Sequence, residues 1–131
     1  MSTAPLRIAI ADDEVDMRDY LLKMLPRLGH LVVAVAADGN QLVAECQRTL
    51  PDLIITDLKM PHRDGLSAVE EIWRGRAVPV IFISAYPQEL ADSAVSKSPL
   101  TTVLVKPIKR ADLEPILRRA ASSQPKPNSS P

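Results

Sequence analysis

Five short apolar segments recur along the chain, and they limit the folds that it can adopt. Each is rich in Val, Ile or Leu and is bounded by polar or turn residues, which is typical of buried strands. Stretches with apolar residues at helical spacing separate them. This alternation predicts an α/β fold in which helices cover both faces of a parallel sheet. The predicted strands are residues 6–11, 31–36, 53–57, 78–84 and 101–105.

A helix is predicted after each strand, which makes five helices. The fourth, residues 87–96, has the weakest pattern. Pro26 is expected to kink or end the first helix near Leu25. The last helix is predicted to begin with Asp112 as its N-cap, so that Pro115 falls in the first turn, where a missing N–H matters little.

The composition predicts one domain over residues 1–121. Of the 131 residues, 46% are hydrophobic, which is enough for a core without disulfide or metal crosslinks. Residues 122–131 are rich in Ser and Pro and are expected to be disordered. The 16 basic and 16 acidic residues balance, which argues against nucleic-acid binding by bulk charge. No apolar run is long enough to span a bilayer, so we expect no membrane contact and a cytoplasmic location.

Polar residues gather where four of the predicted strands end. Asp12 and Asp13 follow the first strand, Asp57 ends the third, Ser84 ends the fourth and Lys106 follows the fifth. Right-handed crossovers bring the carboxyl ends of all parallel strands to one edge of the sheet, where ligands bind in open α/β folds. Each residue has a simpler explanation as a helix cap or a solvated strand end, but their common placement predicts a site.

The residue types at this edge suit phosphoryl chemistry on a metal ion. Three carboxylates repel one another unless a cation lies among them, and hard oxygen ligands favour Mg²⁺. The ionised Asp57 is able to attack phosphorus and form an acyl phosphate. Lys106 would supply an ammonium and Ser84 a hydroxyl to neutralise the phosphoryl oxygens.

These motifs resemble the receiver domains of two-component response regulators, the family of the chemotaxis response regulator. The matching residues are Asp12-Asp13, the segment from Asp57 to Gly65, Ser84-Ala85 and Lys106-Pro107. The resemblance covers residues 6–121 and implies a flavodoxin-like, doubly wound (βα)5 fold with strand order 2-1-3-4-5. It also implies that the Lys59 backbone carbonyl is a metal ligand beside Asp12, Asp13 and Asp57, and that Lys106-Pro107 is a cis peptide.

The chain departs from the family pattern in three places. Val103 occupies the position, three residues before the lysine, where the family often has an aromatic switch residue. The stretch 96–100 replaces a frequent Gly-Ala pair. Tyr86 lies two residues after Ser84, where its ring would either shield an acyl phosphate or pack on the fourth helix.

The resemblance implies a signalling module rather than an enzyme. A sensor histidine kinase or a phosphotransfer protein would phosphorylate Asp57, and the output would pass to an unknown downstream protein from a monomer or weak dimer. We expect no direct DNA binding, because only ten residues follow residue 121. The chain is equally interpreted as a receiver fragment of a larger regulator, since a Pro- and Ser-rich tail also resembles a linker.

Other functions are less compatible with the sequence. A haloacid dehalogenase-type phosphatase carries a second Asp two residues after the nucleophile, where this chain has Lys59. A P-loop enzyme would need a Gly-rich Gly-Lys-Ser/Thr loop, which the sequence lacks. The remaining alternative is a pseudo-receiver that binds a partner without responding to phosphate, which the Val103 substitution keeps open.

Overall fold

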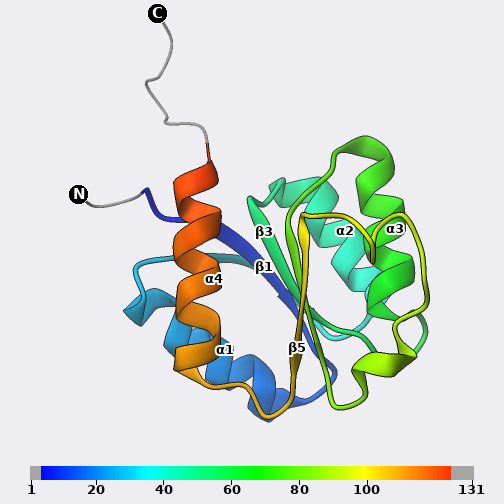
Figure 1. Ribbon diagram of the computed structural model, residues 1–131, viewed down its shortest axis with the longest axis horizontal. Helices are drawn as coiled ribbons and strands as arrows, with labels where there is room; N and C mark the ends of the chain where they lie inside the picture. The colour runs from blue at the N-terminus through cyan, green and yellow to red at the C-terminus, as the bar shows by residue number, and fades with distance from the viewer. Residues whose placement is uncertain (1–3, 125–131) are drawn as a thin grey trace, which may run out of the picture.

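The sheet has five parallel strands in the order β2-β1-β3-β4-β5, as predicted. The computed structural model describes residues 4–124, which include four α-helices and one short 3-10 helix (Figure 1). The strands are β1 (Arg7–Ala11), β2 (Leu31–Ala36), β3 (Leu53–Asp57), β4 (Val80–Ser84) and β5 (Thr101–Val105). The helices are α1 (Val15–Arg27), α2 (Gly39–Thr49), η1 (Pro87–Glu89), α3 (Gly65–Gly75) and α4 (Arg110–Ser123).

The helices cover both faces of the sheet, because β1, β3 and β4 are apolar on both sides. Helices α1 and α4 lie on one face and α2 and α3 on the other (Figure 1). Every residue of β3 and β4 is buried. Two core clusters result, one around Leu25 and Ile55 on the α1/α4 side and the other around Leu42 and Phe82 on the α2/α3 side. Cys46 belongs to the second cluster, and burial raises the pKa of its thiol to about 12.

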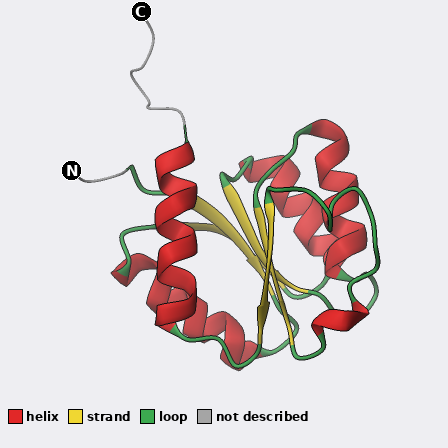
Figure 2. Cartoon of the chain, viewed as in Figure 1, coloured by secondary structure: helices red, strands yellow, loops and turns green. Residues whose placement is uncertain are grey.

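The predicted helix over 87–96 is wrong. Only η1 forms there, and a loop of turns continues to β5 (Figure 2). Ser93 and Ser96 each accept the other's backbone N–H through their hydroxyls, at 2.8–3.0 Å, so side chains replace helical hydrogen bonds. Val95 is buried and anchors the loop, while Val103 and Val105 on β5 are 37% and 54% exposed. The fold is therefore the predicted one with one helix fewer.

The last helix begins earlier than predicted. Lys109 is the N-cap of α4, and Asp112 is the third helical residue, where its carboxylate accepts the Lys109 N–H at 2.9 Å. An Asp suits either position, because both satisfy a free N–H at the helix start. Pro115 consequently lies in the helix interior rather than in the first turn. At the other end, α4 includes Ser122 and Ser123, and residues 125–131 of the predicted disordered tail lie outside the described residues.

Helix α1 also differs slightly from its predicted extent. It continues through Pro26 to Arg27. A proline in the last turn removes only one backbone hydrogen bond, so the helix is able to extend one residue beyond it. Gly29 follows with a φ of 90°, a left-handed conformation that ends the helix and favours glycine.

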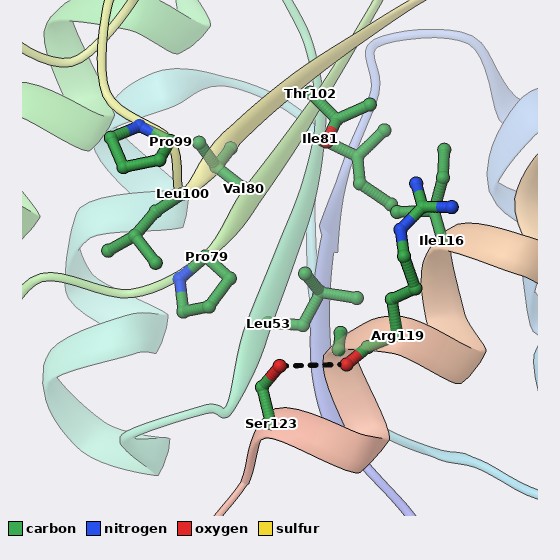
Figure 3. A pocket seen from close by; sticks show the side chains of 11 residues that line it. Leu53, Pro79, Val80, Ile81, Pro99, Leu100, Thr102, Ile116, Arg119 and Ser123 are labelled. Carbon is green, nitrogen blue, oxygen red and sulfur yellow. Dashed lines mark hydrogen bonds between the residues drawn. The ribbon is translucent and has the colours of Figure 1, made fainter.

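A groove of about 270 Å³ lies between the sheet and the end of α4 (Figure 3). It is at the amino edge of the sheet, because Leu53 begins β3, Val80 begins β4 and Pro99 precedes β5. Its α4 wall includes Arg119, whose carbonyl accepts the hydroxyl of Ser123 at 2.9 Å. The groove is mostly apolar and lies at the opposite edge from the predicted site.

Candidate functional site

The carboxyl edge of the sheet brings the predicted acidic residues together. Asp57 is the last residue of β3, and Asp12 and Asp13 directly follow β1, the neighbouring strand. Each of the three contributes a carboxylate oxygen, and these oxygens lie within 4.8 Å of one another. Asp12 and Asp57 are buried, at 1% and 6% exposure, whereas Asp13 is exposed. The topology thus produces a crowded set of like charges.

Lys106 is the cation that the fold places against these carboxylates. It directly follows β5, and the predicted cis peptide bond joins it to Pro107. Its Nζ lies 3.3 Å from Asp57 Oδ2 and 3.3 Å from Asp12 Oδ2. Nζ is also 3.2 Å from Glu14 Oε1, a contact that the sequence analysis missed although Glu14 adjoins the two aspartates. One ammonium therefore faces three carboxylates.

The electrostatics of the site follow from burial and from like charge. Burial raises the pKa of Asp57 to about 6, and the charge of Asp12 adds to the shift while Lys106 opposes it. The pKa of Asp12 is raised by burial as well. Burial acts to lower the pKa of Lys106, but the charges of Asp12 and Asp57 outweigh it and raise the value overall. Ionisation of Asp12 and Asp57 is therefore less favourable in this site than in water.

The donor set fits a hard divalent cation. Within residues 4–124, Asp12 Oδ2 and Trp73 Nε1 are the buried side-chain atoms without a hydrogen-bond partner. Although Lys106 Nζ is 3.3 Å from Asp12 Oδ2, the pair does not have hydrogen-bond geometry. An unsatisfied buried carboxylate oxygen beside two further carboxylates suits Mg²⁺, which prefers oxygen ligands and retains water.

Ser84 and Lys59 are the two remaining residues that were predicted for the site. Ser84 ends β4 beside β3, is 2% exposed, and accepts the Tyr86 N–H on its hydroxyl at 2.9 Å. Lys59 lies in the loop after β3, and its side chain forms an exposed ion pair with Glu89 of η1 at 3.2 Å. The ring of Tyr86 is 59% exposed, and α-helix is absent from residues 87–96, so the alternative in which this ring packs on a fourth helix does not occur.

The chain belongs to the response regulator receiver domain family. The family description, response regulator receiver domain, matches residues 8–118, which is most of the chain. Receiver domains are signalling modules of two-component systems. The resemblance predicted from Asp12-Asp13, Asp57, Ser84 and Lys106-Pro107 is therefore confirmed at the level of the family.

Particular relatives agree with this assignment. The transcriptional regulatory protein PdtaR of Mycobacterium tuberculosis is 36% identical over 121 residues, which cover 92% of this chain and 59% of PdtaR. The receiver domain of a Pseudomonas aeruginosa sensor histidine kinase, with magnesium coordinated in its active-site cleft, is 35% identical with a TM-score of 0.78, covering 92% of this chain and 100% of that one. The Erythrobacter litoralis PhyR receiver domain has a TM-score of 0.80 at 26% identity, covering 97% and 98%.

The chain thus spans less than two thirds of the length of PdtaR, although it matches the isolated receiver domains over nearly their whole length. None of the helices within residues 4–124 is long and apolar enough to cross a membrane.

Proposed function

We propose that this chain accepts a phosphoryl group on Asp57 and transmits its presence to a partner protein. The observation that carries the proposal is that Lys106 Nζ lies 3.3 Å from a carboxylate oxygen of Asp57 and 3.3 Å from one of Asp12. It joins a buried nucleophilic carboxylate to an ammonium that suits the charge of a phosphoryl group. A sensor histidine kinase or a phosphotransfer protein, acting in the cytoplasm, would be the donor.

The chemical step follows from the chemistry of the Asp57 carboxylate. One of its oxygens attacks the phosphorus of a phosphohistidine, a P–O bond forms and the P–N bond breaks. The imidazole leaves with the electron pair of that bond and takes up a proton. Lys106, already 3.3 Å from Asp57 Oδ2, would compensate the charge of the phosphoryl oxygens, and Ser84 would donate its hydroxyl to one of them.

Asp12, Asp13, Asp57 and the Lys59 carbonyl would hold Mg²⁺. When bound, the ion would offset the repulsion between the carboxylates and the incoming phosphoryl group. The orphaned Asp12 Oδ2 is the observation that favours an ion here. Hydrolysis of the acyl phosphate by water would return Asp57 to its starting state, so the chain acts as a timed switch and turns over no other substrate.

Phosphorylation is tested by intact mass after incubation with acetyl phosphate and Mg²⁺. One added phosphoryl group is expected on the wild type, none on Asp57→Asn, and none on the wild type when EDTA removes the metal. Asp52→Asn is a matched control, because Asp52 lies at the other edge of the sheet and binds the Arg7 N–H at 2.9 Å. An Asp57→Asn protein that is still labelled would refute the assignment.

A pseudo-receiver that responds to its partner without phosphate is the second candidate. Val103, at the position of the family's aromatic switch, is 37% exposed and offers no ring to couple to Ser84. A partner that binds the wild type and Asp57→Asn with equal affinity, in the presence and absence of acetyl phosphate, would favour this candidate.

A further inference from the structure

The loop between β3 and α3, residues 58–64, is closed tightly against the sheet. The Leu58 N–H donates to the Ile83 carbonyl at 3.1 Å, and the Gly65 N–H donates to the Leu58 carbonyl at 2.8 Å. A Cβ atom at Gly65 would lie 2.3 Å from the Asp57 carbonyl oxygen, so the approach requires glycine. This loop contains Lys59, whose backbone carbonyl is one of the proposed metal ligands.

The backbone of Arg63 ties the far end of this loop to α2. The Gly39 N–H, at the start of α2, donates to the Arg63 carbonyl at 3.0 Å, and a Cβ at Gly39 would lie 2.5 Å from that oxygen. The Arg63 N–H donates to the Pro61 carbonyl at 2.7 Å across His62, which has a φ of 69°. The chain therefore makes a tight three-residue turn immediately before Arg63.

The side chain of Arg63 ties the same loop to α3. Its Nε donates to Ser67 Oγ at 2.9 Å, its Nη2 donates to the Ser67 carbonyl at 3.1 Å, and its Nη1 donates to a Glu71 carboxylate oxygen. All three guanidinium nitrogens are engaged, and the side chain is only 24% exposed. Such a planar, multiply bonded arginine holds its partners in one geometry, which a lysine in its place would not reproduce.

We propose that Arg63 is a positioning residue for the metal site. It clamps the 58–64 loop between α2 and α3, and so fixes where the Lys59 carbonyl lies relative to Asp12 and Asp57. Mg²⁺ demands near-ideal octahedral geometry, so a ligand on a loosened loop binds it more weakly. This inference rests on the proposed function, because it assumes that the ion binds among these carboxylates.

The test is the dissociation constant for Mg²⁺, measured by calorimetric titration of the full chain at a temperature where each variant is folded. We expect Arg63→Ala to weaken Mg²⁺ binding by about tenfold. Arg63→Lys should recover part of that loss, because an ammonium is able to pair with Glu71 but not to make the two bonds to Ser67. Arg48→Ala is the matched control, since it breaks a 2.7 Å pair with Glu45 on α2 away from the loop, and it should bind as the wild type does.

A purely structural role would lower the melting temperature of Arg63→Ala and leave the dissociation constant unchanged, and that result would overturn the proposal. If Arg63→Ala does not fold, Glu71→Gln, which weakens one contact, should show a smaller loss of affinity in the same direction, and an unchanged affinity would count equally against it. Asp13→Ala separates the two levels. If the wild type does not bind Mg²⁺, or if Asp13→Ala binds as well as the wild type, the metal site itself is refuted. If binding depends on Asp13 but not on Arg63, only this inference fails.

Discussion

The two edges of the sheet treat buried polar groups in opposite ways. At the amino edge, the buried His30 accepts the Leu6 N–H on Nδ1 at 3.0 Å, and Asp52 exchanges two hydrogen bonds with the backbone of Arg7. Each polar group there has a specific partner. At the carboxyl edge, the carboxylates of Asp12, Glu14 and Asp57 share one lysine, and Asp12 Oδ2 has no hydrogen-bond partner.

This difference separates stability from function within one sheet. Satisfied polar groups rigidify a fold, whereas crowded like charges reduce its stability and are retained where a cation or a phosphoryl group is to bind. Substitutions at the amino edge, which includes the apolar groove at the end of α4 (Figure 3), are therefore expected to change the stability of the fold and to leave the site intact. Substitutions of the charged residues at the carboxyl edge should impair the site without lowering stability.

The largest effect on stability is expected from Leu6→Ala at the amino edge. Leu6 is 1% exposed and belongs to the core on the α1/α4 side. Deleting such a side chain should lower the free energy of unfolding by about 2–5 kcal/mol, as measured by urea denaturation. Phosphorylation by acetyl phosphate should persist at temperatures where the variant is folded. A variant that is folded but is not phosphorylated would show that the two edges are coupled.

Asp57→Asn should stabilise the metal-free protein at pH 7. Because the folded pKa of Asp57 is about 6 against an ordinary 3.8, the folded state binds more protons than the unfolded state between these values, and stability falls as pH rises through that window. Removing the charge should add about 1–3 kcal/mol to the free energy of unfolding, because the pKa of about 6 already includes the opposing attraction of Lys106. Urea denaturation in EDTA measures this. Asp52→Asn at the amino edge should give no gain, and an equal gain would contradict the comparison.

Mg²⁺ should stabilise the wild type by relieving the same repulsion. At a free concentration ten times the dissociation constant, a ligand that binds only the folded state adds about 1.4 kcal/mol. Thermal unfolding with and without Mg²⁺ measures the shift, which EDTA should reverse. The shift should be absent in Asp13→Ala, and an undiminished shift there would place the ion elsewhere.

His30 should give the smallest effect and a pH dependence of the opposite sign. Burial lowers the pKa of His30 below 6.5, so its contribution to stability is complete above pH 6.5 and is lost as pH falls through the lowered folded value. His30→Asn retains an acceptor for the Leu6 N–H but does not titrate. It should lower stability by about 1 kcal/mol at neutral pH, and the loss relative to the parent should shrink on acidification. Denaturation from pH 7.5 to 5 in the Asp57→Asn background isolates this effect, and parallel curves would contradict it.

The strands were the most predictable elements. The bounds of β2, β3 and β5 agree with the predicted ranges, because short apolar runs between turn residues have few alternatives in a buried sheet. The loop after η1 was not predictable in the same way. Leu90 and Val95 suit a helix, but the mutual hydrogen bonds of Ser93 and Ser96 depend on a backbone geometry that no periodicity reveals. The start of α4 was misplaced because an aspartate serves equally as N-cap and as third helical residue.

For the site, the sequence by itself determined which residues lie at the same edge of the sheet. Parallel strands with right-handed crossovers bring Asp12, Asp57, Ser84 and Lys106 to one edge whatever the packing details. Only the tertiary structure decided how the groups at this edge are arranged. Asp12 Oδ2 is left without a hydrogen bond, Glu14 shares Lys106, and Arg63 joins the 58–64 loop to α3 through its side chain and to α2 through its backbone carbonyl. The physical reason is that strand order follows from chain connectivity and hydrophobic pattern, whereas burial, pKa and hydrogen-bond geometry depend on distances between residues that are remote in sequence.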